Sequence, residues 1–273
     1  MNNQKTVLRA VLIFLVAIAL IVYGFPLLYT LNTALKTQRN FLVDPVGITE
    51  GINWENFVQA WEKGNMASGI KNSLLYVSVC TIVSLSMAVF LSYPIARRYV
   101  KFATFIYMLF MIGMFLPDGS IPRWRFIFRM GLYDTRLGYM LTLVGGGGVT
   151  LLMFVSYIRS LPKDLDEAAM IDGCGYLQFI FKILLPLMKP ALASMGVLQA
   201  IGIWNEVTNS VIYFSNKNYF PITRGLYVFR SDYSVKWPEL TAALVIIAVP
   251  MIVLYTFLQK YIIDGIVSGG VKA

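Results

Sequence analysis

The sequence predicts an all-α membrane protein with six transmembrane helices. Of its 273 residues, 58% are hydrophobic, whereas soluble domains have roughly 45–50% apolar residues. The apolar residues gather in six long runs. A backbone in hydrocarbon must satisfy its own hydrogen bonds, and the alternating pattern of a membrane β-strand is absent, so each run is expected to be a helix. We expect residues 1–273 to form one transmembrane domain.

The first apolar run begins behind Lys5 and Arg9. It is longer than the ~20 residues that cross a bilayer and longer than the apolar part of a signal peptide, so it is expected to be a retained span. The glycines 145–148 predict a broken or closely packed helix in the fourth run. The six predicted spans cover approximately residues 7–32, 72–95, 102–116, 137–160, 190–214 and 240–263.

Charge and residue usage exclude several classes of protein. The net charge of +9 is explained by basic residues that flank membrane spans, without nucleic-acid binding. Histidine is absent and the two cysteines lie far apart. A metal site, a disulfide framework and a Ser-His-Asp hydrolase are therefore not expected. The basic residues divide almost evenly between the two sides of the predicted spans, so the charges leave the orientation open.

Two further features lie outside the regular spans or interrupt their apolar character. The stretch "WENFVQAW" places Trp54, Phe57 and Trp61 at helical spacing and predicts a short interfacial helix. Within the fifth run, Asn205 and Glu206 are candidates to line a pathway, because polar residues inside a membrane are often functional. Structural pairing within the helix bundle is the equally weighted alternative. Weaker candidates of the same kind are Tyr76, Ser84, Ser86, Tyr93 and Ser156.

Residues 161–189 are half charged and half apolar, which suits neither a span nor an ordinary loop. Asp164, Asp166 and Glu167 favour the start of a helix, where the helix dipole is positive. Gly173 suits the end of that helix. The segment therefore predicts a short helix over 162–172, a second helical piece over 176–184, and a junction with the fifth span marked by two prolines.

The same segment resembles the EAA loop of bacterial ABC importer permeases. Glu167-Ala168-Ala169, three residues, Gly173, nine residues and Ile183-Leu184-Leu185-Pro186 match every fixed position of that pattern. The resemblance implies the ABC type I importer permease fold, with cytoplasmic EAA coupling helices between spans four and five. It also implies a multi-pass protein of the bacterial cell membrane with its N-terminus inside. The residues that would couple to an ATPase are Glu167, Ala168, Ala169, Asp172, Gly173, Ile183, Leu185 and Pro186.

Three other features resemble the carbohydrate branch of these permeases, and in particular the smaller, six-span permease of maltose-type systems. They are Asn72-Ser73, Trp204-Asn205-Glu206 and the tail "DGIVSGGVKA". The resemblance implies a heterodimer with a second permease, two cytoplasmic ATPase subunits and an extracellular or periplasmic solute-binding protein. The chain has no G-x-x-x-x-G-K-[ST] motif. We therefore expect a non-catalytic subunit without a cofactor of its own, with ATP and Mg on the partner ATPase.

Three alternatives remain open at this point. An ABC permease for a peptide, an amino acid or an anion would share the EAA loop. A secondary transporter or channel would be expected to show inverted repeats or paired broken helices, and no clear repeat is visible. A membrane enzyme has little support without histidine. The residues do not identify a sugar or the share of its site that this subunit supplies.

Overall fold

The computed structural model describes residues 2–117, 119–144, 148–229 and 235–270, and every element within them is a helix. The chain divides into two compact units. Unit 1 comprises Met1–Ala67 and Gly225–Pro250, and unit 2 comprises Ser68–Arg224 and Met251–Ala273. This division does not test the expectation of one transmembrane domain, which stays a prediction.

In unit 1, a side chain from the first turn of helix α3 (Glu55–Lys63) forms hydrogen bonds with the C-terminal end of helix α1 (Asn2–Leu35). The buried Asn56 amide donates to the carbonyl oxygens of Ala34 at 2.8 Å and Lys36 at 2.7 Å. The last carbonyls of a helix lack partners within the helix. Asn56 therefore fixes α3 to the end of α1, beside the short helix α2 (Gln38–Val43).

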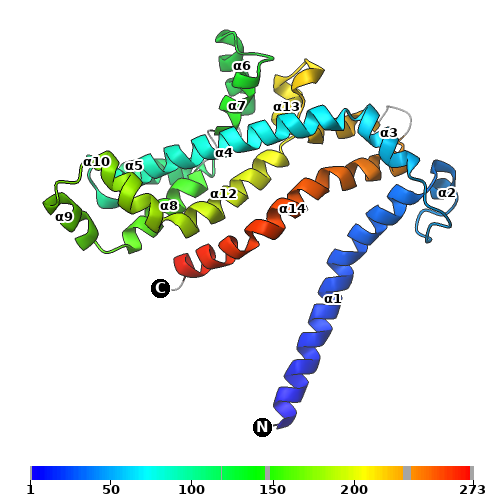
Figure 1. Ribbon diagram of the computed structural model, residues 1–273, viewed down its shortest axis with the longest axis horizontal. Helices are drawn as coiled ribbons and strands as arrows, with labels where there is room; N and C mark the ends of the chain where they lie inside the picture. The colour runs from blue at the N-terminus through cyan, green and yellow to red at the C-terminus, as the bar shows by residue number, and fades with distance from the viewer. Residues whose placement is uncertain (1, 118, 145–147, 230–234, 271–273) are drawn as a thin grey trace. The chain divides into compact units, whose positions relative to one another are not determined.

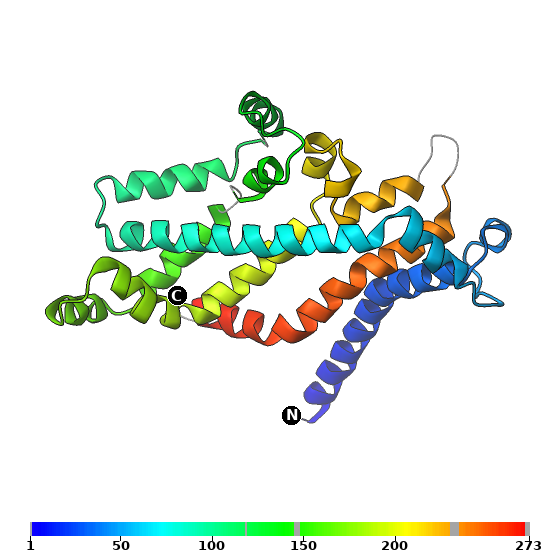
Figure 2. The same ribbon diagram turned by 45° about the horizontal axis from the view of Figure 1, so that its top comes forward.

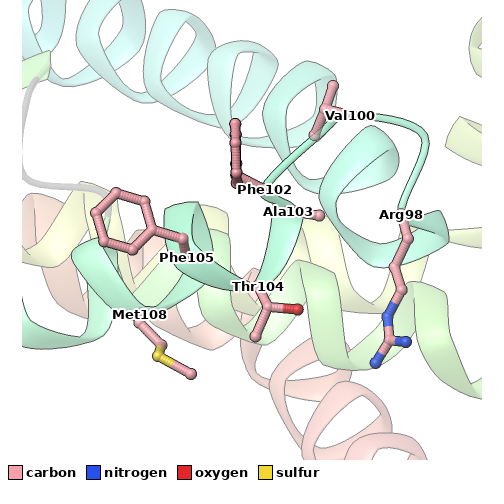
Figure 3. Close-up of a pocket in the computed structure, with 7 residues that line it drawn as sticks. All are labelled: Arg98, Val100, Phe102, Ala103, Thr104, Phe105 and Met108. Atoms are coloured by element: carbon pink, nitrogen blue, oxygen red, sulfur yellow. The ribbon is translucent and has the colours of Figure 1, made fainter.

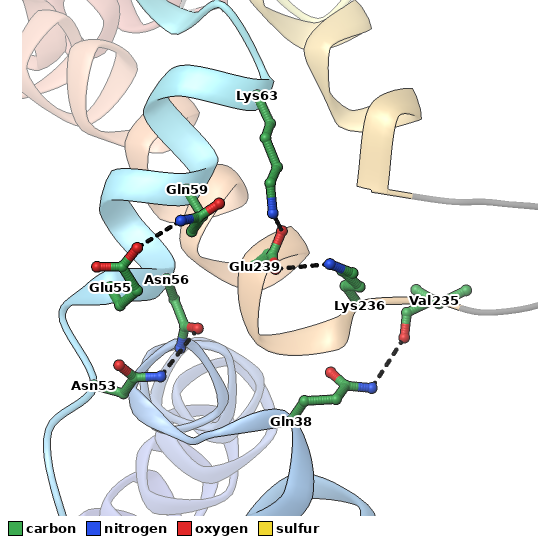
Figure 4. Close-up of polar contacts among 9 residues, drawn as sticks. All are labelled: Gln38, Asn53, Glu55, Asn56, Gln59, Lys63, Val235, Lys236 and Glu239. Carbon is green, nitrogen blue, oxygen red and sulfur yellow. Dashed lines mark hydrogen bonds and ion pairs between the residues drawn. The ribbon is translucent and has the colours of Figure 1, made fainter.

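The predicted short helix around Trp54–Trp61 is present as α3, which also contacts the start of α14 (Trp237–Gly270). Lys63 Nζ lies 3.0 Å from Glu239 Oε2, and Lys236 Nζ lies 3.3 Å from Glu239 Oε1 (Figure 4). Exposed ion pairs contribute at most ~1 kcal/mol each. Of the two, only the Lys63–Glu239 pair joins α3 to α14, because the Lys236–Glu239 pair lies at the start of α14 itself.

Unit 2 is built on helix α4 (Met66–Arg97), which packs with α8 (Gly148–Ser160) and α12 (Lys189–Trp204). Helix α5 (Ala103–Gly113) folds back along the C-terminal half of α4 (Figure 2). The core of this packing contains Val89, Phe154, Ile158, Ile180 and Met195, all of them buried. Helices α9 and α10 lie at the end of unit 2 where α4 ends (Figure 1).

Among the residues that the structure describes, length and composition identify three helices that could cross a membrane, in α1, α4 and residues Trp237–Thr256 of α14. The number rises to five if each of two bent pairs counts as one span. One pair is α7 (Arg136–Val144) with α8, and the other is Tyr176–Leu187 with α12. Because α5 has only 11 residues, the count of six spans stays a prediction. Of the predicted break at glycines 145–148, residues 145–147 lie outside the described residues and Gly148 begins α8.

Residues 190–214, predicted to form the fifth span, are not one continuous helix, and the span itself stays a prediction. Helix α12 ends at Trp204, and a separate helix, α13 (Thr208–Tyr213), follows after residues 205–207. Glu206 Oε1 accepts the backbone N–H of Asn209 at 2.7 Å. A carboxylate that accepts from a backbone N–H near a helix start favours a new helix there. The average hydrophobicity of residues 190–214 is high on both sides of this break, so the sequence pattern did not indicate it.

The first turns of α4 bind the segment that follows α13. The buried Asn72 amide donates to the carbonyl oxygens of Asn218 at 2.8 Å and Phe220 at 3.0 Å. Ser73 Oγ accepts the N–H of Ile222 at 2.9 Å. A Cβ atom on Gly69 would lie 2.8 Å from Ile222 Cα, so only glycine permits this approach. The Asn72-Ser73 pair thus fixes residues 218–222, which overlap the end of the short turn η2 (Lys217–Tyr219).

The turn between α4 and α5 contains two residues with positive φ, Arg98 at 60° and Phe102 at 65°. A hollow of about 550 Å³ lies at this turn and the first turns of α5. Figure 3 shows Arg98 at one edge of the hollow and Phe105 and Met108 at the other. Its lining is mostly apolar. A sugar site needs several converging hydrogen-bonding groups, so we assign no substrate to this hollow.

Candidate functional site

Helix α9 (Asp164–Ile171) forms the first half of the candidate site. Its first turn carries three carboxylates, which favour the positive end of the helix dipole. At its end, the N–H of Cys174 donates to Ala169 O at 2.8 Å and the N–H of Gly173 donates to Met170 O at 3.1 Å. This pair of bonds is a Schellman motif, which requires a left-handed residue. Gly173 has φ +71°, so the predicted helix end at this glycine is confirmed.

The outward face of α9 combines carboxylates with large apolar side chains. Met170 is 60% exposed and Ile171 is 87% exposed, and Glu167 and Asp172 are also exposed. Ala168 and Gly173 add small exposed residues between them. We call this set of six residues, Glu167, Ala168, Met170, Ile171, Asp172 and Gly173, the EAA surface. Carboxylates do not suit a lipid environment and large apolar groups do not suit water, so this surface favours contact with another protein.

The inward face of α9 is held by a buried carboxylate. Asp166 is 3% exposed. Its Oδ1 accepts from Tyr93 Oη at 2.6 Å, and its Oδ2 lies 2.7 Å from Arg97 Nη2. Because the Arg97 side chain is also only 5% exposed, removing either partner would leave an uncompensated buried charge. Such a loss costs about 3–5 kcal/mol.

Arg97 also holds the end of α8. Its Nη1 donates to Leu161 O at 3.2 Å, and its Nη2 donates to Pro162 O at 3.3 Å. Both carbonyls follow the last residue of α8, Ser160. One guanidinium therefore joins the C-terminal end of α4, the residues after α8 and the first turn of α9.

The Tyr93 ring packs against the second helical piece of the segment. Its centroid lies 5.1 Å from that of Phe179, in a stacked arrangement, and 5.7 Å from that of Tyr176. The edge of Tyr99 closes a third side at 5.6 Å. Aromatic pairs at such distances add about 0.5–1.5 kcal/mol beyond the area that they bury. Tyr93 thus links both halves of the segment to α4.

The second half of the segment comprises α10 (Tyr176–Phe179), the π-helical turn η1 (Ile180–Leu184) and α11 (Leu185–Leu187). Ile183 and Leu185 pack against the core of unit 2, and Pro186 is exposed. The chain then bends by 80° into α12. The bend falls at the buried Met188, between the two prolines predicted to mark this junction.

Asn205 and Glu206 lie at the break between α12 and α13. Asn205 is exposed and ends α12, and Glu206 is half-buried and caps α13. Thr223 Oγ1 also donates to Glu206 O at 3.3 Å. These bonds give Glu206 a structural role. A role for either residue in lining a pathway stays a prediction.

Sequence reasoning missed the two partners of Asp166. Arg97 was one of many basic residues near a span end, and Tyr93 was one of several weak polar candidates. The available signal was Asp166 itself, since a carboxylate at a small-residue helix face needs a partner if that face is buried. Spacing along the sequence does not identify a partner some seventy residues away. Among the described residues, no group of three or more His, Cys, Asp or Glu side chains could hold a metal ion.

The described residues include three apolar helices that are long enough to cross a membrane, which indicates an integral membrane protein. The family model described as "Binding-protein-dependent transport system inner membrane component" matches residues 65–267. The chain belongs to this family, and the resemblance noted in the sequence is confirmed.

Curated relatives are similar over nearly the whole chain. A probable ABC transporter permease, YurM of Bacillus subtilis, is 32% identical over 93% of this chain and 85% of its own length. The melibiose/raffinose/stachyose import permease MelC of the same organism is 26% identical over the full length of both. The diacetylchitobiose permease NgcG of Streptomyces coelicolor is 27% identical over 89% of this chain and 82% of its own length.

A solved structure has the same fold. It is a bacterial ABC transporter involved in the import of the acidic polysaccharide alginate. The match has a TM-score of 0.80 at 20% identity and covers 95% of this chain and 97% of the other. The fold of an ABC importer permease is therefore shared by the two chains.

Proposed function

We propose that this chain is one of two permease subunits of an ATP-driven importer for a carbohydrate, and that α9 docks into a separate ATPase subunit. The observation that carries the coupling role is the EAA surface. It exposes Met170 and Ile171 beside Glu167 and Asp172, on a helix whose inward face is held by buried bonds. A soluble protein with an apolar cleft and a basic residue would fit this surface.

The proposed arrangement in the membrane follows from this docking. Six segments cross the bilayer: α1, α4, α5, the α7–α8 pair, α12 with α13, and α14. The EAA surface and the N-terminus lie in the cytoplasm. The second permease completes the pathway, ATP and Mg bind only to the ATPase subunits, and a solute-binding protein delivers the cargo from outside.

Support for a carbohydrate as the cargo comes from similar proteins. MelC, NgcG and the arabinooligosaccharide permease AraQ are named for sugars or oligosaccharides. The alginate transporter of similar fold has also been solved with a periplasmic protein bound to an alginate pentasaccharide. The corresponding solute-binding protein of this system is expected to bind an oligosaccharide.

The docking is tested with a charge reversal and its matched control. The chain is co-expressed with the ATPase and the second permease of its system, and the complex is purified through a tag on this chain. Glu167→Lys is expected to release the ATPase. Glu62→Lys makes the same change at an exposed glutamate of α3 and is expected to retain it. Retention of the ATPase by both variants would refute the proposed docking.

The orientation is tested with a native thiol. Cys174 is half-buried beside the EAA surface, and the other cysteine, Cys80, is fully buried. A membrane-impermeant maleimide is expected to label inside-out vesicles and not right-side-out vesicles, and Cys174→Ser is expected to abolish the labelling. Labelling from the outer side would place the EAA surface outside the cell and contradict the proposal.

The cargo is tested on the solute-binding protein of this system. Its melting temperature is measured with raffinose, diacetylchitobiose, arabinooligosaccharides and alginate oligosaccharides, and with amino acids and dipeptides as the alternative class. Stabilisation by a saccharide alone is expected. Stabilisation by an amino acid or a dipeptide alone would replace the carbohydrate assignment.

A further inference from the structure

The Arg97 guanidinium, at the end of α4, bonds to two other segments of unit 2: the residues after α8 and the first turn of α9. We infer that Tyr93, Arg97, Asp166 and the carbonyls of Leu161 and Pro162, together called the Arg97 junction, hold α9, the end of α4 and the end of α8 as one rigid body. A displacement of α9 is then passed to the membrane helices through this junction. The inference rests on the proposed docking of an ATPase on the EAA surface.

The junction is the principal attachment of α9. The buried residues of this helix are Asp166 and Ala169. Ala169 packs into the apolar core of unit 2, and among the described residues Asp166 is the one side chain of α9 that makes polar bonds to another helix. Hydrogen bonds in which both groups are charged are shorter and stronger than neutral ones. A pull or push on the EAA surface therefore reaches α4 mainly through the Asp166 carboxylate.

The chain on either side of α9 differs in how firmly it is held. On the N-terminal side, Arg97 binds the carbonyls of Leu161 and Pro162. On the C-terminal side, Gly173 and Gly175 have no neighbouring atom within 4 Å of an added Cβ. There is therefore free space beside the backbone at both glycines. Without the junction, α9 would be free to pivot about them.

The bonding pattern suits positioning better than stability. A buried ion pair contributes little net stability, because the two charges lose their hydration. An apolar pair of similar volume would fill the same space without fixing a direction. The guanidinium instead presents a planar fork of donors whose geometry fixes the angles between the three segments. The junction is therefore assigned a positioning role, and its residues are not catalytic residues.

A distance measurement tests the rigid body directly. Spin labels are attached at Ile82→Cys, on an exposed position of α4, and at Lys163→Cys, just before α9. The native thiols are removed by Cys80→Ala and Cys174→Ala. Pulsed electron paramagnetic resonance on the assembled complex compares the nucleotide-free state with the state trapped by ATP and vanadate. In the otherwise unchanged chain, the distance is expected to shift by less than ~2 Å, as for a helix pair that moves together.

Breaking the junction should uncouple the two labels. With Asp166→Asn, trapping is expected to shift the distance by about 5 Å, the size of a one-turn displacement, or to broaden its distribution to a similar width. Asp164→Asn makes the same change at an exposed carboxylate in the same turn of α9 and is expected to behave as the unchanged chain. An unaltered distance in Asp166→Asn would overturn the inference.

A double variant separates positioning from folding. Arg97→Met with Asp166→Leu replaces the ion pair by apolar groups, which restores packing but not the directed bonds. The yield of assembled complex is expected to recover relative to Asp166→Asn, while the altered distance persists. Recovery of both would show that the junction serves stability only. If both Glu167→Lys and Glu62→Lys retained the ATPase, the docking itself would be refuted, and the inference with it.

Discussion

Replacing Gly173 by alanine isolates one contribution to the docking of α9, the backbone conformation at its end. Gly173 has φ +71°, and an added Cβ would meet no atom within 4 Å. Steric crowding is therefore absent, and the cost is only that of a left-handed conformation, about 1–2 kcal/mol. That cost falls on the Schellman bonds from Gly173 and Cys174 to Met170 and Ala169.

The expected effect is a weaker complex with the ATPase. A cost of one or two kcal/mol changes a population ratio by about 5–30-fold. Binding must restore the correctly ended helix, so the Kd of the ATPase for the permease in nanodiscs is expected to rise by up to that factor. Gly173→Asn is expected to have a smaller effect, because asparagine adopts the left-handed region more readily than alanine. Microscale thermophoresis with labelled ATPase measures both variants.

Gly131 is a matched control, because it follows the C-cap residue of α6 (Ser120–Arg129) as Gly173 follows that of α9. Gly131 also has φ +71°, and its added Cβ also meets nothing within 4 Å. Gly131→Ala thus carries the same backbone cost away from the EAA surface and should leave the Kd unchanged. An unchanged Kd for Gly173→Ala, or an equal rise for Gly131→Ala, would show that the reasoning about this helix end is wrong.

Three further variants test other parts of the structure. Gly69→Ala should lower stability by about 1–3 kcal/mol through overpacking against Ile222. Gly202→Ala, with open space around it in α12, should instead raise stability by about 0.5–1 kcal/mol. Equal melting temperatures of the two variants in fluorescence-detected size exclusion would show that the close approach of Gly69 to Ile222 is unimportant. Asn56→Ala leaves buried carbonyls at the end of α1 without partners and should cost about 1–3 kcal/mol, measured as a lower melting temperature, and an unaltered value would contradict the capping role. Glu206→Gln should keep the capping acceptor and the stability, while Glu206→Ala should lose ~1 kcal/mol; loss of uptake in Glu206→Gln at full stability would instead favour a carboxylate in the pathway.

The sequence predicted the local features of the EAA segment better than its attachments. The end of α9 at Gly173 depends on a single residue type in a single conformation, and it was therefore visible in the sequence. The bonds of Asp166 to Tyr93 and Arg97 join residues that are distant along the chain. A single sequence contains no signal for such a pairing, because each residue has an ordinary local explanation.

The break after Trp204 was missed for a different physical reason. Helix prediction in the fifth run relied on its average apolar character, which is high on both sides of the break. Glu206 was read as an intramembrane polar group, whereas its side chain accepts the backbone N–H of Asn209 and begins α13. A polar residue within an apolar run can therefore mark a helix start as well as a site. Apolar character also gave the third run more helical residues than α5 has, since α5 is 11 residues long.

The π-helical turn Ile180–Leu184 has a consequence for how the length of this segment can vary. A π turn takes in one more residue than an α turn, so the nine-residue spacing between Gly173 and Ile183 includes one residue beyond what a regular helix would use. Deletion of the exposed Lys182 could be absorbed if the wide turn closed to a regular one. The turn cannot take up an inserted residue in the same way, so an insertion at this place would rotate Leu185 and Pro186 about the helix axis. This segment is thus expected to tolerate the deletion of one residue here better than an insertion.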